Sequence, residues 1–148
     1  MKYYLLRCEV PGNHGTNTIY DKSIIPWKIV HLSVNFEGWM GGEFLTSQSA
    51  FIVSKHIQNS LNFNFTGILG YEYVDISFSE DFKRNQTDFS IPEFVRILIG
   101  ENAFVDDFGV TKYKGLYNQL IISERAWKFL SNFNLGIYKI EIVYQDNL

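Results

Sequence analysis

"FIVSKHIQNSLNFNFTGI" occupies residues 51–68, and "LIISERAWKFLSNFNLGI" occupies residues 120–137. The two stretches align at a constant offset. The alignment places identical residues in register at Ile52/Ile121, Ser54/Ser123, Leu61/Leu130, Gly67/Gly136 and Ile68/Ile137. Near-repetition within one small chain predicts two copies of the same local architecture.

Each stretch follows one plan, in which an apolar triplet typical of a strand runs into a serine and a helical period begins directly after it. Ser54 and Ser123 therefore stand at N-cap positions, where the hydroxyl accepts a hydrogen bond from an amide of the first helical turn. Gly67 and Gly136 lie past the helices, where residues in the left-handed conformation end a helix. In the second copy one helical face is apolar, formed by Ala126, Trp127, Leu130 and Phe133.

The residues around the two stretches extend the pattern. Residues 137–144 alternate as a half-buried strand does, residues 71–78 do the same, and segments 31–44 and 96–108 resemble each other upstream. We therefore expect half-repeats over about residues 27–78 and 94–144, each a strand, a turn, a short strand, a helix and a strand. Together they predict one α+β domain over residues 1–148, with a mostly antiparallel sheet and two short helices. The polar stretch 79–94 is expected to connect the halves at the surface.

Composition sets limits on the function. The chain has 148 residues, the length of one ordinary domain. Its net charge of −3 means that it lacks the overall positive charge that nucleic-acid binding usually needs. Cys8 is the single cysteine, which excludes an intrachain disulfide. No apolar run has the length of a membrane span and no secretory signal begins the sequence. We expect a cytoplasmic protein that binds neither nucleic acid nor membrane.

Reaction chemistry is hard to find in the sequence. His14, His31 and His56 have none of the spacings that bring two histidines to one metal ion, so no metal and no other cofactor is expected. Ser54 and Ser123 lack the flanking glycines of a nucleophile elbow and are interpreted as helix caps. The "DFG" at residues 107–109 stands without the rest of a kinase. We predict a protein that is not an enzyme.

Four residues are candidates for contact with a partner. Trp39 stands in the glycine-rich "EGWMGGE", where it is either an exposed interface aromatic or a residue packed in the core. Asp106 and Asp107 form an acidic turn that is either solvated or in contact with a partner, and Glu101 precedes them in the same segment.

The segment "FVRILIG…DDFGV…LIISERAWKFLSNFNLGIYKIEIV" resembles a group of small bacterial proteins associated with polymorphic and contact-dependent toxin systems. Those proteins carry a strand ending in Val/Ile-Ser-Glu-Arg, a helix with a leucine, a glycine and a final strand, with an Asp-Ile/Phe pair upstream. The matching residues here are Ile122-Ser123-Glu124-Arg125, Leu130, Gly136 and Asp107-Phe108. The resemblance covers about residues 94–144, and residues 31–78 are a diverged copy in which Ser54-Lys55 replaces Ser-Glu.

The resemblance implies an immunity protein, which binds a cognate toxin domain and blocks it without catalysis. Trp39, Glu101, Asp106 and Asp107 are then the expected partner-binding residues, and acidic side chains would complement a basic, nuclease-like cleft. An accessory domain that binds a small molecule or a peptide in an aromatic-lined crevice is the alternative. A hydrolase with an unrecognised site is a third hypothesis.

Overall fold

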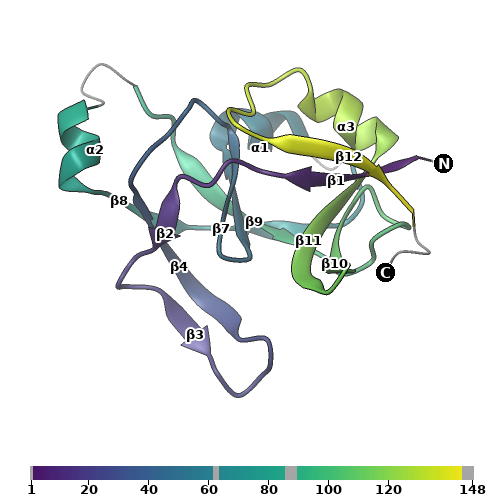
Figure 1. Cartoon of the computed structure of the whole chain (residues 1–148), viewed down its shortest axis with the longest axis horizontal. Helices are drawn as coiled ribbons and strands as arrows, with labels where there is room; N and C mark the ends of the chain where they lie inside the picture. The colour runs from purple at the N-terminus through teal and green to yellow at the C-terminus, as the bar shows by residue number, and fades with distance from the viewer. Residues whose placement is uncertain (1, 62–63, 86–89, 145–148) are drawn as a thin grey trace.

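The computed structural model describes residues 2–61, 64–85 and 90–144, in which twelve strands form three sheets (Figure 1). The first sheet has the order β10-β11-β1-β12, formed by β1 (Tyr3–Arg7), β10 (Phe108–Tyr113), β11 (Leu116–Ser123) and β12 (Lys139–Val143). The second has the order β5-β6-β9-β7, formed by β5 (Phe44–Ser47), β6 (Ala50–Ser54), β7 (Ile68–Glu72) and β9 (Phe94–Ile99). In the third, β4 (Lys28–Phe36) pairs with β2 (Gly12–His14), β3 (Ile19–Asp21) and β8 (Val74–Phe78).

All of these pairings are antiparallel except the one between β4 and β8. The predicted α+β class with a mostly antiparallel arrangement is thus confirmed. The helices of the described residues are α1 (Lys55–Leu61), α2 (Glu80–Asn85) and α3 (Glu124–Leu130). None of them has the length and apolar character needed to cross a membrane.

Strand β6 explains why residues 51–53 are apolar without a break. All five of its residues are buried, because each face of the strand meets a different core. Phe51 and Val53 join the core between the first two sheets, whereas Ala50 and Ile52 join the core beneath β4. A strand covered on both faces is expected to be a continuous apolar run.

The predicted caps are confirmed. Ser54 Oγ accepts a hydrogen bond from Ile57 N at 3.1 Å, and Ser123 Oγ accepts one from Ala126 N at 3.1 Å. Gly67 and Gly136 have positive φ angles of 95° and 64°, but they lie in the loops after α1 and α3 rather than at the helix ends. In each of these two loops, a left-handed residue is therefore needed where the chain turns toward the next strand, not where the helix ends.

Helix α2 was not predicted, because residues 79–94 were interpreted as a surface connection. Ser79 caps this helix through its hydroxyl, which accepts a hydrogen bond from Phe82 N at 3.1 Å. Acidic residues occupy the first turn and basic residues the last, which suits the helix dipole. Phe82 is buried against Phe36 and Phe78, so one apolar side chain anchors a short helix that is otherwise polar.

The first two sheets exchange strands between the two halves of the chain. Strand β9 pairs with β6 and β7, and β1 pairs with β11 and β12. The two capping serines occupy matching positions, since Ser54 lies opposite Phe94 in β9 and Ser123 lies opposite Tyr3 in β1. Strand β4, which the sequence alignment set against the segment 96–108, lies in the third sheet instead. The internal duplication itself remains a prediction.

Candidate functional site

Asp107, one of the predicted partner-binding residues, is bound inside the molecule. Its carboxylate accepts hydrogen bonds from Ser123 Oγ at 2.6 Å and from Thr66 N at 3.0 Å, and it forms an ion pair with Arg125 Nη2 at 2.6 Å. Desolvation raises the pKa of Asp107, but the hydrogen bonds from Arg125, Ser123 and Thr66 outweigh it, so the pKa lies below its ordinary value. Asp107 thus fixes the start of α3.

The first half contains a similar arrangement. Glu43 Oε1 accepts a hydrogen bond from Ser54 Oγ at 2.9 Å and lies 3.0 Å from His56 Nδ1. In both halves the carbonyl of the acidic residue also accepts a hydrogen bond from the backbone N–H of the capping serine, at 2.8 Å. Glu43 and Asp107, each followed by a phenylalanine at the end of the similar segments 31–44 and 96–108, therefore stabilise the starts of α1 and α3. Asp106 is half-buried beside Asp107, and its N–H donates to Asn102 O at 3.0 Å.

Trp39 is buried, with 7% of its surface exposed, and its Nε1 donates to Gly42 O at 2.8 Å. Of the two interpretations that the sequence left open, the structure supports packing in the core. The tryptophan lines a shallow groove of about 530 Å³. Val10, Met40 and Ile137 are exposed around that groove.

Glu101 is exposed and lies in a groove beside the connection between β3 and β4. It lines a groove of about 620 Å³ together with Leu69, Val110 and Asn118. One wall of this groove is the connection between β3 and β4, residues 22–27, which projects away from the first sheet (Figure 1). The other side is formed by β9, β10 and β11.

The tip of the β3–β4 hairpin, defined as residues 24–27, exposes apolar side chains. Ile25 is 91% exposed and Trp27 53%, and Ile24 beside them is exposed as well. The tip is supported at its base, where Arg96 Nη1 of β9 donates to Ile29 O at 3.0 Å. Isolated exposed apolar residues are ordinary, but adjacent ones on a projecting hairpin mark an interaction surface.

A second projection, the β10–β11 turn, has the same chemistry. Leu116 and Tyr117 are exposed at the start of β11, and Lys112 Nζ lies 5.0 Å from the centre of the Tyr117 ring. At the tip, Lys22 Nζ lies 4.7 Å from the centre of the Trp27 ring. Each projection thus presents an aromatic ring with a lysine ammonium over it, which is attracted to the face of the ring.

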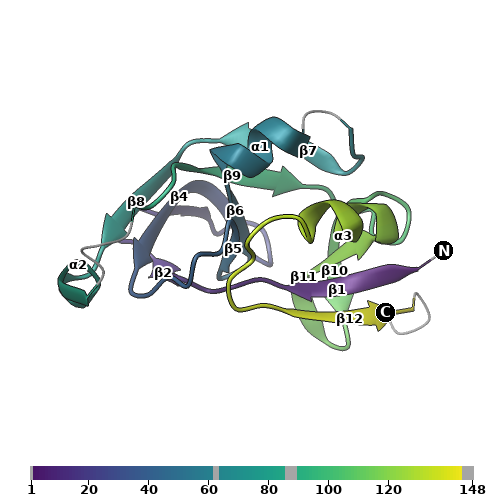
Figure 2. The same cartoon turned by 90° about the horizontal axis from the view of Figure 1, so that it is seen from above.

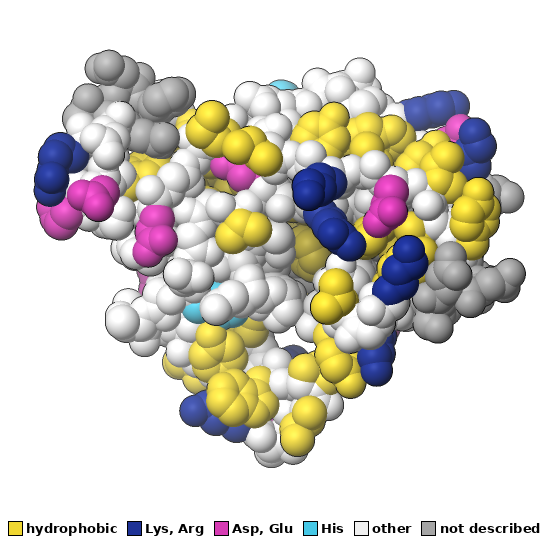
Figure 3. Space-filling view, viewed as in Figure 1, with side chains coloured by type: hydrophobic (Ala, Val, Ile, Leu, Met, Phe, Trp, Pro, Cys, Tyr) yellow, Lys and Arg dark blue, Asp and Glu magenta, His cyan; other side chains and the backbone are white. Residues whose placement is uncertain are grey.

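We name the tip, the β10–β11 turn and the groove between them the two-pronged face. Yellow apolar and dark blue basic side chains lie together at the lower end of the molecule, over the β3–β4 hairpin (Figure 3). Lys22, Lys28, Lys112 and Lys114 are exposed on the two projections, against Glu101 and the half-buried Asp21. This face is therefore basic although the chain carries a net charge of −3.

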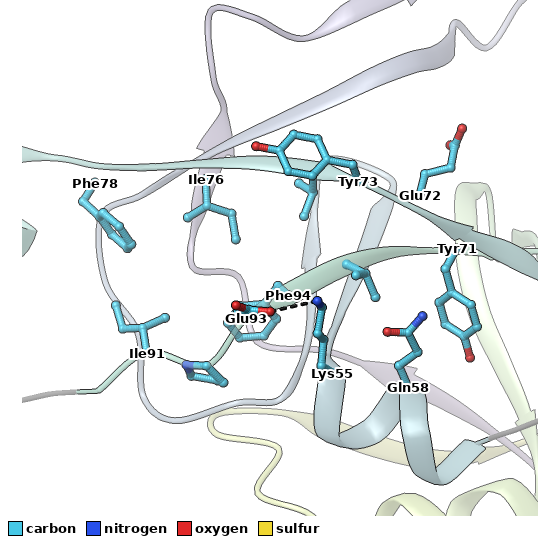
Figure 4. A pocket seen from close by; sticks show the side chains of 13 residues that line it. Lys55, Gln58, Tyr71, Glu72, Tyr73, Ile76, Phe78, Ile91, Glu93 and Phe94 are labelled. Atoms are coloured by element: carbon cyan, nitrogen blue, oxygen red, sulfur yellow. Dashed lines mark ion pairs between the residues drawn. The ribbon is translucent and has the colours of Figure 1, made fainter.

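A separate cleft of about 740 Å³ opens where β7 and β8 diverge at Tyr73, because β7 pairs with β9 while β8 pairs with β4. Lys55 of α1 and Glu93 form an ion pair at 2.8 Å beside it, and the hydrogen bond from Lys55 lowers the pKa of Glu93 (Figure 4). Aromatic side chains surround the cleft, namely Tyr71, Tyr73, Phe78 and Phe94.

The histidines each have a partner of their own. His14 lies between Tyr20 Oη and Ser47 O, His31 lies 3.3 Å from Asp75 Oδ2, and His56 contacts Glu43. Among the described residues, no three side chains of His, Cys, Asp or Glu converge on one point where a metal ion would bind.

Sequence reasoning missed the tip. The predicted half-repeats begin at about residue 27, so Ile24 and Ile25 received no role. A signal was present, because an apolar run outside any periodic element, between Lys22 and Lys28, is unusual for a loop.

Comparison of the chain with protein-family models, with curated proteins and with solved structures gave no match.

Proposed function

We propose that this chain is an immunity-type protein, which binds a toxin domain and blocks it by contact without catalysis. The observation that carries the proposal is the exposed apolar tip, Ile24, Ile25 and Trp27, on a hairpin that projects from the body. A projecting apolar hairpin suits insertion into the cavity of a partner. Trp and Tyr are also the residue types that most often dominate binding energy at protein interfaces.

The basic character of the two-pronged face changes the charge that is expected on the partner's surface. The sequence suggested acidic side chains meeting a basic cleft, but the carboxylate of Asp107 is neutralised internally by Arg125. Lysines lie around the apolar tip instead, so an acidic rim around an apolar cavity is the complementary surface. Charges of opposite sign at the rim of an interface mainly increase the rate of association.

A photo-crosslinking side chain at position 25 tests the assignment in cells that produce the chain. We expect a single protein crosslinked from position 25 and none from position 128. Lys128 is exposed on α3, a different element, so position 128 controls for random contact. A protein captured equally from both positions would contradict the assignment of the two-pronged face.

Two matched variants separate the tip from apolar surface in general. The double variant Ile25→Ser/Trp27→Ala removes apolar surface from the tip, whereas Val10→Ser/Met40→Ala removes it from side chains that are 63% and 62% exposed elsewhere. We expect the tip variant to lose the captured partner and the control to keep it. Far-ultraviolet circular dichroism of both variants checks that each remains folded. Loss of the partner in both variants would contradict the assignment of partner binding to the tip.

The cleft beside Lys55 and Glu93 supports a second candidate function, binding of a small apolar ligand. Its volume of about 740 Å³ and its aromatic lining match those of ligand sites, which are mostly apolar with a few polar groups. A thermal-shift screen of apolar metabolites tests this function. A ligand that raises the melting temperature of the wild type but not of Tyr73→Ala would support it. Equal shifts in both proteins would contradict it.

A further inference from the structure

Strand β12 forms one edge of the first sheet, since its described pairing is with β1 alone. The register runs without a bulge from Lys139 opposite Arg7 to Val143 opposite Tyr3. In Figure 2 the strand lies beside β1, at the end of the first sheet. A regular edge strand presents a row of backbone N–H and C=O groups that can pair with another strand.

The side chains of this edge protect it only in part. Edge strands are usually protected by short length, prolines, bulges, charged side chains, especially lysine, or inward-pointing charges. Strand β12 has no proline, and apolar side chains are exposed along one face of it and its flanks, at Tyr138, Ile142 and Tyr144. Lys139 and Glu141 alternate with them on the other face.

Lys139 also lies in an unfavourable position within its own chain. It stands directly opposite Arg7 in β1, and like charges directly opposite one another destabilise a sheet. Glu141 reaches Arg7 at 4.0 Å, whereas no acidic side chain of the described residues forms an ion pair with Lys139. A carboxylate beyond the edge of the sheet would supply the missing partner.

We propose that β12 pairs with β12 of a second copy of this chain, antiparallel and centred on Ile140. In that register Lys139 of each copy faces Glu141 of the other, so two ion pairs of opposite charge form symmetrically. Ile140 faces its own counterpart and Tyr138 faces Ile142, which covers the exposed apolar side chains of the edge. The product is a two-fold symmetric dimer with one continuous eight-stranded sheet.

The neighbouring registers are less favourable. Centring on Lys139 sets two lysines opposite each other, and centring on Glu141 sets two glutamates opposite each other. A shift of a single residue between the strands would turn the side chains of one copy to the opposite face of the sheet. Of the registers centred on Lys139, Ile140 and Glu141, the one centred on Ile140 is therefore favoured by charge.

This dimer is independent of the proposed function. Strand β12 belongs to the first sheet, whereas the tip belongs to the β3–β4 hairpin of the third. Loss of the dimer would leave the tip in place, and loss of partner binding would leave the edge in place.

Sedimentation of the full chain over a concentration series, with charge-reversal variants, tests the pairing. We expect a wild-type dimer whose Kd rises on the order of tenfold or more in Lys139→Glu or in Glu141→Lys, since each change sets like charges opposite each other. An equimolar mixture of the two single variants should dimerise again, because an acidic side chain then faces a basic one at both pairs across the interface. The double variant Lys139→Glu/Glu141→Lys should also restore the dimer.

Circular dichroism melts of the single variants show whether each remains folded. The mixture also guards against misfolding, since a chain that does not fold would not be rescued by its complement. A wild type that is monomeric up to about 0.5 mM would overturn the proposal. So would a dimer whose Kd neither single change affects, or a mixture that stays monomeric while both variants are folded.

Discussion

At the scale of single residues, each capping serine is hydrogen-bonded to an acidic residue that stands directly before the neighbouring strand, Glu43 before β5 and Asp107 before β10. Ser123 donates to Asp107 and accepts from Ala126 N, so its hydroxyl joins the residue before β10 to the first turn of α3. Arg125, in the first turn of α3, donates to the other carboxylate oxygen of Asp107. The hydroxyl is therefore bonded on both sides within a buried setting.

Ser123→Ala should lower the free energy of unfolding by about 1–2 kcal/mol, since it removes a cap and leaves Asp107 with one hydrogen bond fewer. Urea unfolding followed by circular dichroism measures the loss. Ser60→Ala is the matched control, because Ser60 is exposed on α1 and its hydroxyl donates to His56 O, and we expect a change within about 0.5 kcal/mol. Equal losses in both variants would show that the capping contact is not what stabilises α3.

The ion pair of Asp107 also makes stability depend on pH. The pKa of Asp107 is lowered in the folded chain, so its stabilisation is complete above the unfolded value of about 3.9 and is lost as pH falls through the folded value. Asp107→Asn should therefore destabilise the chain at neutral pH, and its difference from wild type should shrink below about pH 4.

Urea midpoints of both proteins between about pH 2 and pH 7 measure this difference. Asp81→Asn is the control, since the Asp81–Arg84 pair is exposed and contributes little at any pH. A gap between Asp107→Asn and wild type that stays constant down to about pH 2 would contradict the assignment.

At the scale of elements, the sequence predicted what local chemistry determines. The apolar triplets, the capping serines and the alternation of residues 137–144 predicted β6, β11, α1, α3 and β12, which spans 139–143. Helix α2 escaped prediction because Phe82 supplies its single anchor, which is too short a pattern to reveal a period. The exchange of β1 and β9 between sheets also escaped, since strand partners far apart in the chain leave no local signal.

A side chain of the second sheet contacts the base of the β3–β4 hairpin. Arg96 is 13% exposed at its side chain, and its Nη1 reaches both Ile29 O at 3.0 Å and Glu72 Oε1 at 3.2 Å. This guanidinium joins the base of the hairpin to the second sheet. The rest of the hairpin projects from the body of the molecule (Figure 1).

Arg96→Leu should lower the free energy of unfolding by about 1–3 kcal/mol, because it leaves Ile29 O and Glu72 without their partner. Amide exchange in residues 19–30 should accelerate more than exchange in β11, which lies in another sheet. Arg84→Leu, which breaks an exposed ion pair on α2, should change stability by less than about 1 kcal/mol. Unchanged exchange in the hairpin of Arg96→Leu would mean that its base is held by other contacts.

At the scale of the whole molecule, charge is distributed unevenly. Three of the predicted partner-binding residues are acidic and the net charge is −3, but the two-pronged face carries four exposed lysines. Of the four residues predicted to bind a partner, Glu101 lies on that face, whereas Asp107 serves α3 and Trp39 is buried. Net charge does not determine local charge, and only the fold brings residues 22–28 and residues 112–117 toward the same end of the molecule.

The most direct test of the immunity-type function is the growth of bacterial cells that produce the protein crosslinked from position 25. We predict that growth stops when this partner is produced alone and recovers when the wild-type chain is produced with it. Ile25→Ser/Trp27→Ala should fail to restore growth, whereas Val10→Ser/Met40→Ala should restore it. A partner that is harmless alone, or a tip variant that protects as well as the wild type, would contradict the proposed function.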